Sequence, residues 1–387
     1  RDCLLSRGLG DVYKRQMKLF MQKPLIQKFD HAKEFVEAYQ IGEGDFILAS
    51  KRIYETYFAP LNLKARVEYK SNYGAGEPTD VMIDALLADF RKAGCDRIIA
   101  IGGGAVIDMA KILVLDGNAA AEQYFRREVP LRKVHPLIAV PTTCGAGSEV
   151  SNVSITELTS IHSKLGLAVD EIYADDAVLI PELLTELPYE FFATSAIDAF
   201  IHAIESYVSP KANLYTKMFS MKAMEMIIEG FRAIAEKGPE YRMELLEQFL
   251  IASNLAGIAF GNAGTGMVHA MSYPLSGHYH VAHGEANYQF LTAVFAAYQK
   301  MKPEGEIREL NQFLGNLLKC EEDIVYIELE KLLDRMIGRK KLREYGMKEE
   351  EIRLFAESVN ESQQRLLNQS YVKPTVEQME EVYRQLY

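Results

Sequence analysis

The stretch RIIAIGGG occupies residues 97–104, and a helical pattern follows it from Ala105 to Leu115. A short apolar run of this kind is typical of a buried strand. Glycine lets the backbone approach an anion, and the free N–H groups at the start of a helix favour negative charge. Strand, glycine triplet and helix together predict a phosphate-binding turn in an α/β domain, whereas the triplet alone is equally well a tight turn without a ligand.

The same alternation of strands and helices extends from Met17 to about Pro188. Further strands are expected at 45–50, 65–69 and 137–140, and a helix at 81–93 after the start signal at 78–80. This alternation predicts a parallel sheet with helices on both faces. A second loop, PTTCGAGSE at 141–149, follows the strand at 137–140, and its small and hydroxyl residues can line a nucleotide. Cys144 in this loop is interpreted as a packing residue rather than a nucleophile, because no histidine adjoins it in the sequence.

From residue 189 onward the strand-like runs stop, and long amphipathic stretches follow at 191–208, 214–236, 242–259 and 284–301. The sequence therefore predicts a Rossmann-like nucleotide domain at 17–188 and an all-helical domain at 189–387. Residues 1–16 precede a credible start at Met17 and lack the apolar core of a signal peptide. We expect them to be a non-native leader or an artefact, with an ordered N-terminal arm as the alternative.

Charge and cysteine content narrow the class of protein. The net charge of −11 argues against nucleic acid or an anionic membrane as a partner, and no apolar run reaches the roughly 18–20 residues of a membrane span. The four cysteines lack the short spacings of a zinc site or a disulfide framework. A cytoplasmic protein with a small-molecule substrate is expected.

Two residues of the first helical stretch, Asp198 and His202, are one turn apart on the same face. A carboxylate and an imidazole at this spacing can bind one divalent ion. His269 and His283 would complete a set of three nitrogens and one oxygen, which suits Fe(II) or Zn(II). Such a pair alone is more often structural, but the glycine-rich loop in the same chain favours a metal site.

GGGAVIDMAK at 102–111, PTTCGAGSE at 141–149 and the Asp/His/His/His set together resemble the iron-containing (group III) alcohol dehydrogenases. The resemblance covers the chain from Met17 onward. It implies a dehydroquinate synthase-like fold, an α/β domain followed by an all-α metal-binding domain. It also implies that the four residues bind Fe(II), with Zn(II) as the alternative, and that the cofactor is NAD, with NADP left open. The residues that it places against the cofactor are Gly103, Gly104, Asp108, Thr142, Thr143, Ser148 and Lys164. A solvated surface lysine is the alternative for Lys164.

The chain departs from the family pattern at three positions. Ala105 replaces a serine that usually follows the glycines. Ser50 ends the first strand where many NAD-using members have an aspartate for the adenosine ribose, so NADP remains an alternative. Tyr273 stands where many relatives have a histidine thought to relay protons. Tyr273 itself and His280 are therefore the candidate proton-transfer residues, with His278 as a further substitute; either histidine is equally well a plain loop residue.

Within the family, the segments 264–274 and 283–288 most resemble members that act on 4-hydroxybutyrate. The resemblance implies hydride transfer between a nicotinamide cofactor and the pair 4-hydroxybutyrate and succinate semialdehyde, by a homo-oligomer that is a dimer or larger. A general short-chain alcohol or diol dehydrogenase is the first alternative. A metal- and NAD-dependent lyase like dehydroquinate synthase is more remote, because its basic phosphate site has no obvious counterpart here. A non-enzymatic binding protein is the outermost alternative.

Overall fold

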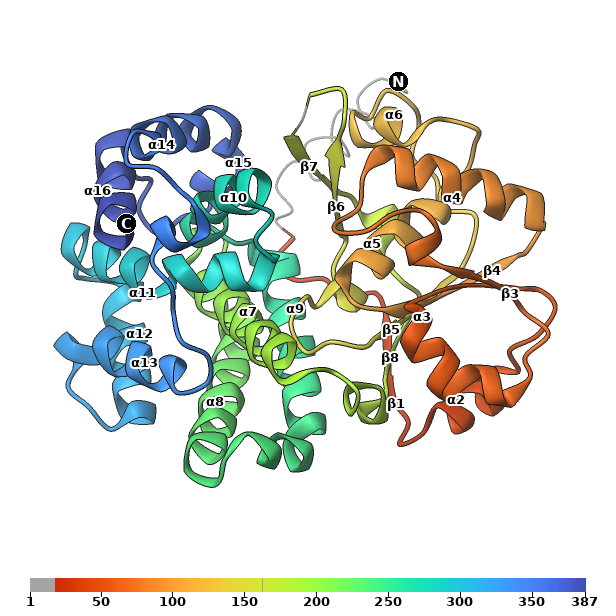
Figure 1. Cartoon of the computed structure of the whole chain (residues 1–387), viewed down its shortest axis with the longest axis horizontal. Coiled ribbons are helices and arrows are strands. Elements are labelled where there is room, and N and C mark those ends of the chain that lie inside the picture. Colours follow the sequence, from red (N-terminus) through yellow and green to blue (C-terminus); the bar gives the residue numbers. More distant parts are fainter. Residues whose placement is uncertain (1–17, 162) are drawn as a thin grey trace, which may run out of the picture.

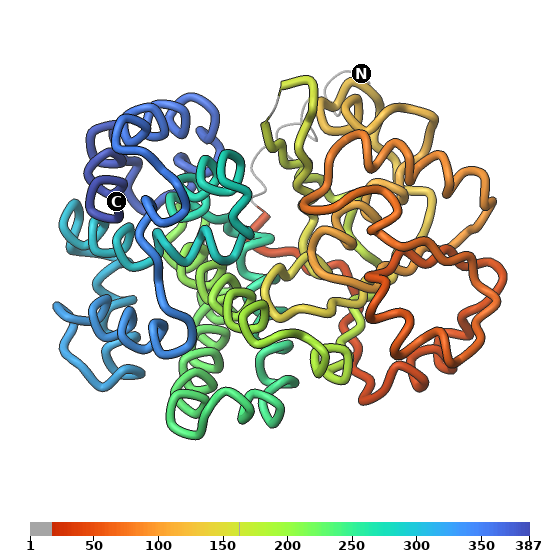
Figure 2. The backbone as a smooth tube through the Cα atoms, viewed as in Figure 1, coloured from red at the N-terminus to blue at the C-terminus, as the bar shows by residue number. Residues whose placement is uncertain are grey.

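The computed structural model describes residues 18–161 and 163–387, so the expected leader at 1–16 lies outside the described residues. Figure 1 shows two lobes side by side, one built on a sheet and one made of helices, with α7 (Tyr189–Val208) and α9 (Leu246–Ala263) on the side of the helical lobe next to the sheet lobe. Figure 2 shows that the chain completes most of the sheet lobe before it enters the helical lobe. The sequence therefore predicts the fold class correctly.

The sheet is parallel and has the strand order β1-β8-β5-β4-β2-β3. Four of its strands correspond to the runs expected from the sequence, and β1 and β8 were not predicted. Its members are β1 (Leu25–Lys28), β2 (Asp45–Ala49), β3 (Arg66–Tyr69), β4 (Arg97–Gly102), β5 (Leu137–Pro141) and β8 (Asp176–Leu179).

Both faces of the sheet are covered, because alternate side chains of a strand point to opposite faces. On β4, Ile98 and Ala100 belong to a core shared with α4 (Asp80–Ala93) and α5 (Gly104–Leu113). Ile99 and Ile101 belong to the core on the other face, which α2 (Ala32–Tyr39) and α3 (Lys51–Ile53) cover. This double burial explains why the central strands are continuous apolar runs.

The carboxyl ends of β4 and β5 lie at the same level, because Gly102 pairs with Pro141 in the register of the two strands. The amide of Thr142 also donates a hydrogen bond to the carbonyl of Gly102 at 3.1 Å. The two loops that the sequence singles out therefore start next to each other. This is the edge of an open α/β sheet where ligands bind.

An antiparallel hairpin, β6 (Val153–Leu158) and β7 (Ser163–Ala168), was not predicted. It stands outside the main sheet, on the side of the sheet lobe that faces α10 (Met267–Tyr279) and α15 (Gln364–Leu367) of the helical lobe (Figure 1). The buried amine of Lys111 anchors the hairpin to α5 by donating to the carbonyl of Val153 at 2.5 Å. The hairpin thus extends from the sheet lobe toward the helical lobe.

The helical lobe begins at Tyr189 and contains no strand in its described residues. The predicted helices are present, and α10 was missed because Gly264, Gly266 and Pro274 interrupt its pattern. Because the last strand ends at Leu179 and α7 begins ten residues later, we propose a domain boundary in that interval. The remaining long helices are α8 (Leu214–Lys237), α11 (His283–Met301), α12 (Glu306–Leu318), α13 (Val325–Asp334), α14 (Glu351–Ser362) and α16 (Val376–Leu386).

One helical stretch, Pro239–Ala263, is long and apolar enough to cross a membrane, with a mean hydropathy of 1.2 in its most apolar window. That window is 56% buried inside the protein. Its α9 part lies in the core shared with α7 and α8, where Phe249 and Leu250 are buried. Core packing therefore accounts for its composition.

Candidate active site

Helix α7 carries three buried polar residues along one stripe of an otherwise apolar core helix. Asp198, His202 and Glu205 follow each other at spacings of four and three residues, which puts them on one face. Each is at most 5% exposed. Buried ionisable groups are costly unless they are paired or bind a metal, so this stripe marks a functional site.

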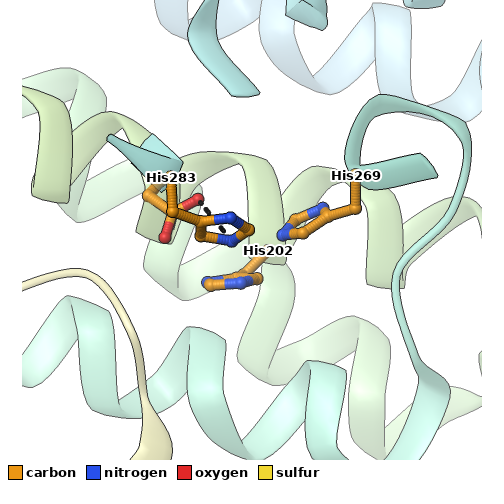
Figure 3. Close-up of side chains that lie close together, drawn as sticks. His202, His269 and His283 are labelled. Carbon is orange, nitrogen blue, oxygen red and sulfur yellow. Dashed lines mark ion pairs between the residues drawn. The ribbon is translucent and has the colours of Figure 1, made fainter. Parts of the chain in front are cut away.

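The structure brings the four sequence-predicted ligands together. One ligand atom each from Asp198, His202, His269 and His283 lies within 4.8 Å of the others. Figure 3 shows the three imidazole rings turned toward one another, with a dashed line between His283 and the Asp198 carboxylate. His269 comes from α10 and His283 from the first residue of α11, so three helices contribute to the cluster.

The close approach of α11 to α7 depends on Gly284. A Cβ at this position would lie 2.7 Å from the carbonyl oxygen of Thr194 and 3.3 Å from Cβ of Asp198. Any side chain would push the start of α11 away from α7. Glycine therefore allows His283, its neighbour in the chain, to reach the Asp198 side of the cluster.

His202 and His269 each have one ring nitrogen fixed by a partner behind the cluster. Nδ1 of His202 donates to the carbonyl of Gly145 at 3.1 Å, and Nδ1 of His269 donates to the carboxylate of Glu205 at 2.6 Å. Nε2 of each ring is then the nitrogen left with a lone pair. Partners of this kind set the tautomer of metal-binding histidines.

Asn287 links the other two members of the cluster. Its amide donates to Oδ1 of Asp198 at 2.8 Å and lies 3.1 Å from Nε2 of His283. Asn287 is one turn after His283 on α11, and it is fully buried. It therefore orients the carboxylate from the side opposite to α7.

The pKa shifts of Asp198, His202 and His283 favour the protonation states that metal ligands need. Burial lowers the pKa of His202 to about 4, against the opposing effect of Asp198. Burial also lowers the pKa of His283. Burial alone would raise the pKa of the Asp198 carboxyl, but the three imidazoles and the Asn287 amide hold it below its usual value. Neutral imidazoles and an ionised carboxylate are the ligand forms.

The chemistry of the donor set fits a divalent transition metal. Nε2 of His269 is buried and has no hydrogen-bond partner among the described residues, although its ring stacks 4.8 Å from that of His202. A buried ring nitrogen without a partner is costly, and a metal ion at the centre of the cluster would satisfy it. Three nitrogens and one oxygen suit iron or zinc.

The glycine loop and the second loop form a tightly packed cradle beside this cluster. A Cβ on Gly104 would lie 2.8 Å from Cβ of Ala146 and 3.5 Å from Oγ of Ser148, and one on Gly103 would lie 3.3 Å from Cγ2 of Thr143. Gly103 also caps the N-terminus of α5. The cradle thus presents backbone N–H groups at a helix start, which suits a pyrophosphate. The second loop, at 141–149, also carries the Gly145 carbonyl that accepts the hydrogen bond from Nδ1 of His202.

Asp108 has protein partners for both carboxylate oxygens. Oδ2 accepts from the amide of Ile155 at 3.0 Å, and Oδ1 accepts from the amine of Lys111 at 3.3 Å. The bond to Ile155 ties α5 to β6, whereas the bond to Lys111 lies within α5. The expected contact of Asp108 with the cofactor stays a prediction, and the structure gives this residue a role in fixing the hairpin.

Lys164 is on β7, next to Glu77 with which it forms an ion pair. Its amine lies 5.5 Å from the centre of the Tyr273 ring, and that ring lies 6.3 Å from the ring of His283. Burial would raise the pKa of Glu77, but Lys164 and His283 hold it below its usual value. Lys164 therefore lies at the junction of the hairpin with the metal cluster, and its side chain is only 14% exposed.

The two candidate proton-transfer residues have different surroundings. Tyr273 is half-buried beside the cluster, and burial raises its pKa to about 12, so its phenol stays protonated near neutral pH. His280 is exposed and ends α10 in a left-handed conformation, with φ of 53°. It makes no side-chain hydrogen bond with the part of the chain that the structure describes. The ring of His278 packs against Phe355 instead.

Ser50 and Cys144 occupy contrasting places. Ser50 stands at the carboxyl end of β2, just before α3, where an adenosine ribose would be bound in an α/β nucleotide domain. Cys144 is fully buried in the helical core, and burial raises the pKa of its thiol to about 12. A thiol in this state is a poor nucleophile, which agrees with the packing interpretation of Cys144.

Glu205 and Asn287 are functional residues that the sequence reasoning missed. Both have a sequence signal, since Glu205 continues the Asp198–His202 stripe and Asn287 is one turn after His283. The bonds of Glu205 to His269 and of Asn287 to Asp198 could not be read from the sequence, because each crosses between two helices. A search for further polar residues on the ligand-bearing face of each apolar helix could have identified Glu205 and Asn287.

A sheet lobe with a glycine cradle and a helical lobe with a buried Asp/His/His/His cluster define a metal-dependent, nucleotide-binding enzyme class. The model of the iron-containing alcohol dehydrogenases matches residues 27–181, and the model of the C-terminal part of this family matches residues 192–387. The chain belongs to the iron-containing alcohol dehydrogenase family.

Relatives and solved structures agree with this membership. The chain is 52% identical to the 4-hydroxybutyrate dehydrogenase of Clostridium kluyveri, over 96% of this chain and 100% of that protein. It is 32% identical to a probable alcohol dehydrogenase, EutG, of Salmonella typhimurium, over 74% and 72% of the two chains. The structure of an iron-containing alcohol dehydrogenase from Thermococcus thioreducens superposes with a TM-score of 0.79 and 27% identity, over 95% of this chain and 99% of the other.

Proposed function

We propose that the chain transfers a hydride between a nicotinamide cofactor and the pair 4-hydroxybutyrate and succinate semialdehyde. The observation that carries the proposal is the convergence of Asp198, His202, His269 and His283 beside the glycine cradle. The similarity to the Clostridium kluyveri enzyme over the whole chain supports the choice of substrate.

In this mechanism, Asp198, His202, His269 and His283 hold the metal and Glu205, Gly145 and Asn287 keep them oriented. A divalent metal bound there would act as a Lewis acid toward the substrate oxygen. The ligands do not identify the metal: zinc generally binds such sites more tightly than iron at equilibrium, so metal supply and site geometry decide which ion is bound. We propose Fe(II) from the family to which the chain belongs.

The protein's own groups position the cofactor and handle the proton. The cradle at Gly103, Gly104 and the second loop would hold the pyrophosphate, and Lys164 would lie near the cofactor ribose. Tyr273, protonated near neutral pH, donates a hydrogen bond at the reacting oxygen but does not serve as a general base. His280, exposed at the end of α10, is the candidate that exchanges the proton with solvent.

The test uses metal-stripped protein, with NADH oxidation followed anaerobically before and after Fe(II) is added. Succinate semialdehyde and butyraldehyde are compared, because they share chain length and differ in the carboxylate. Metal-dependent turnover with a strong preference for the semialdehyde supports the proposal. Equal rates would make the chain a general short-chain alcohol dehydrogenase, and a His269→Ala protein that kept both metal and rate would refute the metal site.

A further inference from the structure

Arg365 is an unusual cation at the junction of the two lobes. It is exposed on the short helix α15, and its side chain makes no ion pair or hydrogen bond with any residue in 18–161 or 163–387. Its guanidinium nevertheless reaches the hairpin of the other lobe, since Nη2 lies 3.5 Å from where a Cβ on Gly166 would stand. The guanidinium is therefore in van der Waals range of the hairpin at Gly166.

Gly166 connects Arg365 to the proposed site through the geometry of the strand. Gly166 and Lys164 are two residues apart on β7, so their side-chain positions lie on the same face. Lys164 lies over the ring of Tyr273, which in turn neighbours His283. The guanidinium of Arg365 therefore lies at one end of a row formed by Lys164, Tyr273 and His283, and the candidate metal ligands lie at the other end.

An anionic substrate needs such a cation in this place. The site contains the carboxylates of Asp198, Glu77 and Glu205, and the ion pair with Glu77 largely neutralises Lys164. With a divalent ion bound, its charge and that of Lys164 would balance the three carboxylates, so Arg365 is the cation left over for a substrate carboxylate. Arginine suits the task because its planar fork binds a carboxylate through two parallel hydrogen bonds.

We propose that Arg365 binds the carboxylate of the substrate while its aldehyde or alcohol end lies at the metal ligands. This inference rests on the proposed function, and it names the residue that distinguishes a hydroxy acid from a plain alcohol. Because Arg365 and Gly166 come from different lobes, the carboxylate would also bridge the helical lobe and the hairpin.

The experiment compares Arg365→Gln and Arg365→Lys with the wild type, as Fe(II)-loaded holoenzyme with NADH. Arg308→Gln is the matched control, since Arg308 is an exposed arginine on α12 whose side chain also has no partner among the described residues. We expect Arg365→Gln to lower kcat/KM for succinate semialdehyde by about 10- to 100-fold, mainly through KM, as for a lost charge-assisted hydrogen bond. The value for butyraldehyde should change little, and Arg365→Lys should fall in between because it keeps the charge but not the fork.

Binding of butyrate to the NADH complex, measured by calorimetry, gives a readout that does not depend on turnover. Weaker butyrate binding in Arg365→Gln but not in Arg308→Gln would support the inference. Unchanged semialdehyde preference and butyrate affinity in Arg365→Gln would overturn it, as would an equal loss with both aldehydes, which indicates a structural role. A wild type that does not discriminate between the aldehydes would instead refute the proposed substrate.

Discussion

Glu205 on α7 determines which nitrogen of His269 faces the candidate metal centre. Its carboxylate accepts a hydrogen bond from Nδ1 of His269 and another from the amide of Val268, each at 2.6 Å. Both oxygens are therefore used by the first turn of α10, which fixes the imidazole in position and leaves Nε2 for the cluster. Glu205 is 2% exposed, so water cannot replace either bond.

Replacing Glu205 with glutamine should weaken metal binding. The amide cannot match the negative charge that polarises His269, and partners of this type typically contribute about 10- to 100-fold to metal affinity. We expect metal content after dialysis against a chelator to fall in Glu205→Gln. Glu190→Gln, an exposed residue of the same helix, is the control. Wild-type metal retention in Glu205→Gln would contradict this role.

Substituting Gly104 with alanine should damage cofactor binding and leave the metal site intact. The new Cβ would lie 2.8 Å from Cβ of Ala146, so the two loops of the cradle must separate. We expect KM for NADH to rise by about tenfold, equivalent to roughly 1.4 kcal/mol of lost binding, with unchanged metal content. Gly44→Ala is the matched control, because a Cβ there meets nothing within 4 Å. An unaltered KM for NADH would show that the cradle does not bind the cofactor.

An aspartate at position 50 should make the enzyme more selective for NADH. The carboxylate would accept hydrogen bonds from the ribose hydroxyls and repel the 2′-phosphate of NADPH. We expect the ratio of kcat/KM for NADH to that for NADPH to rise by about tenfold in Ser50→Asp, for roughly 1.4 kcal/mol of added discrimination. Ser50→Asn controls for size without charge. If both variants keep the wild-type ratio, the ribose lies elsewhere.

The buried carboxyl of Glu149 should make stability depend on pH. Burial raises its pKa above the usual value of 4.5, although Asn254 and Lys111 oppose the shift. Between the unfolded and the folded pKa the native state binds more protons than the unfolded state, so stability falls as pH rises through that window. Glu149→Gln keeps the Asn254 contact, made at 2.8 Å in the wild type, and removes the titration.

As pH rises above about 4.5, the pKa of this glutamate in the unfolded chain, the Tm of Glu149→Gln should therefore rise relative to the Tm of the wild type. Thermal unfolding of both proteins across pH 4 to 8 measures it. Glu229→Gln, an exposed residue of α8, should follow the wild type throughout. Parallel curves for Glu149→Gln and the wild type would show that Glu149 is already ionised in the folded protein.

The elements with strong periodicity were predictable, and those stabilised by tertiary contacts were not. The strand and helix on either side of the glycine triplet appear where the sequence indicates, at 97–102 and 104–113. The hairpin at 153–168 was missed because its strands are half-polar and it is held by Lys111 of α5. Helix α10 was missed because tertiary contacts, such as the Glu205 bond to Val268, secure a start that local propensity disfavours.

The sequence by itself determined the strand–glycine–helix turn, the helical second half and the Asp198–His202 pair one turn apart. These are local properties, since periodicity, glycine content and side-chain spacing are all carried by neighbouring residues. The family motifs singled out His269 and His283, and the tertiary structure brings both to that pair. Only the tertiary structure decided that Glu205, Gly145 and Asn287 orient the cluster and that Arg365 reaches the hairpin. Those contacts join residues up to 199 positions apart, as Gly166 and Arg365 are, and no local pattern specifies which long-range partners packing will bring together.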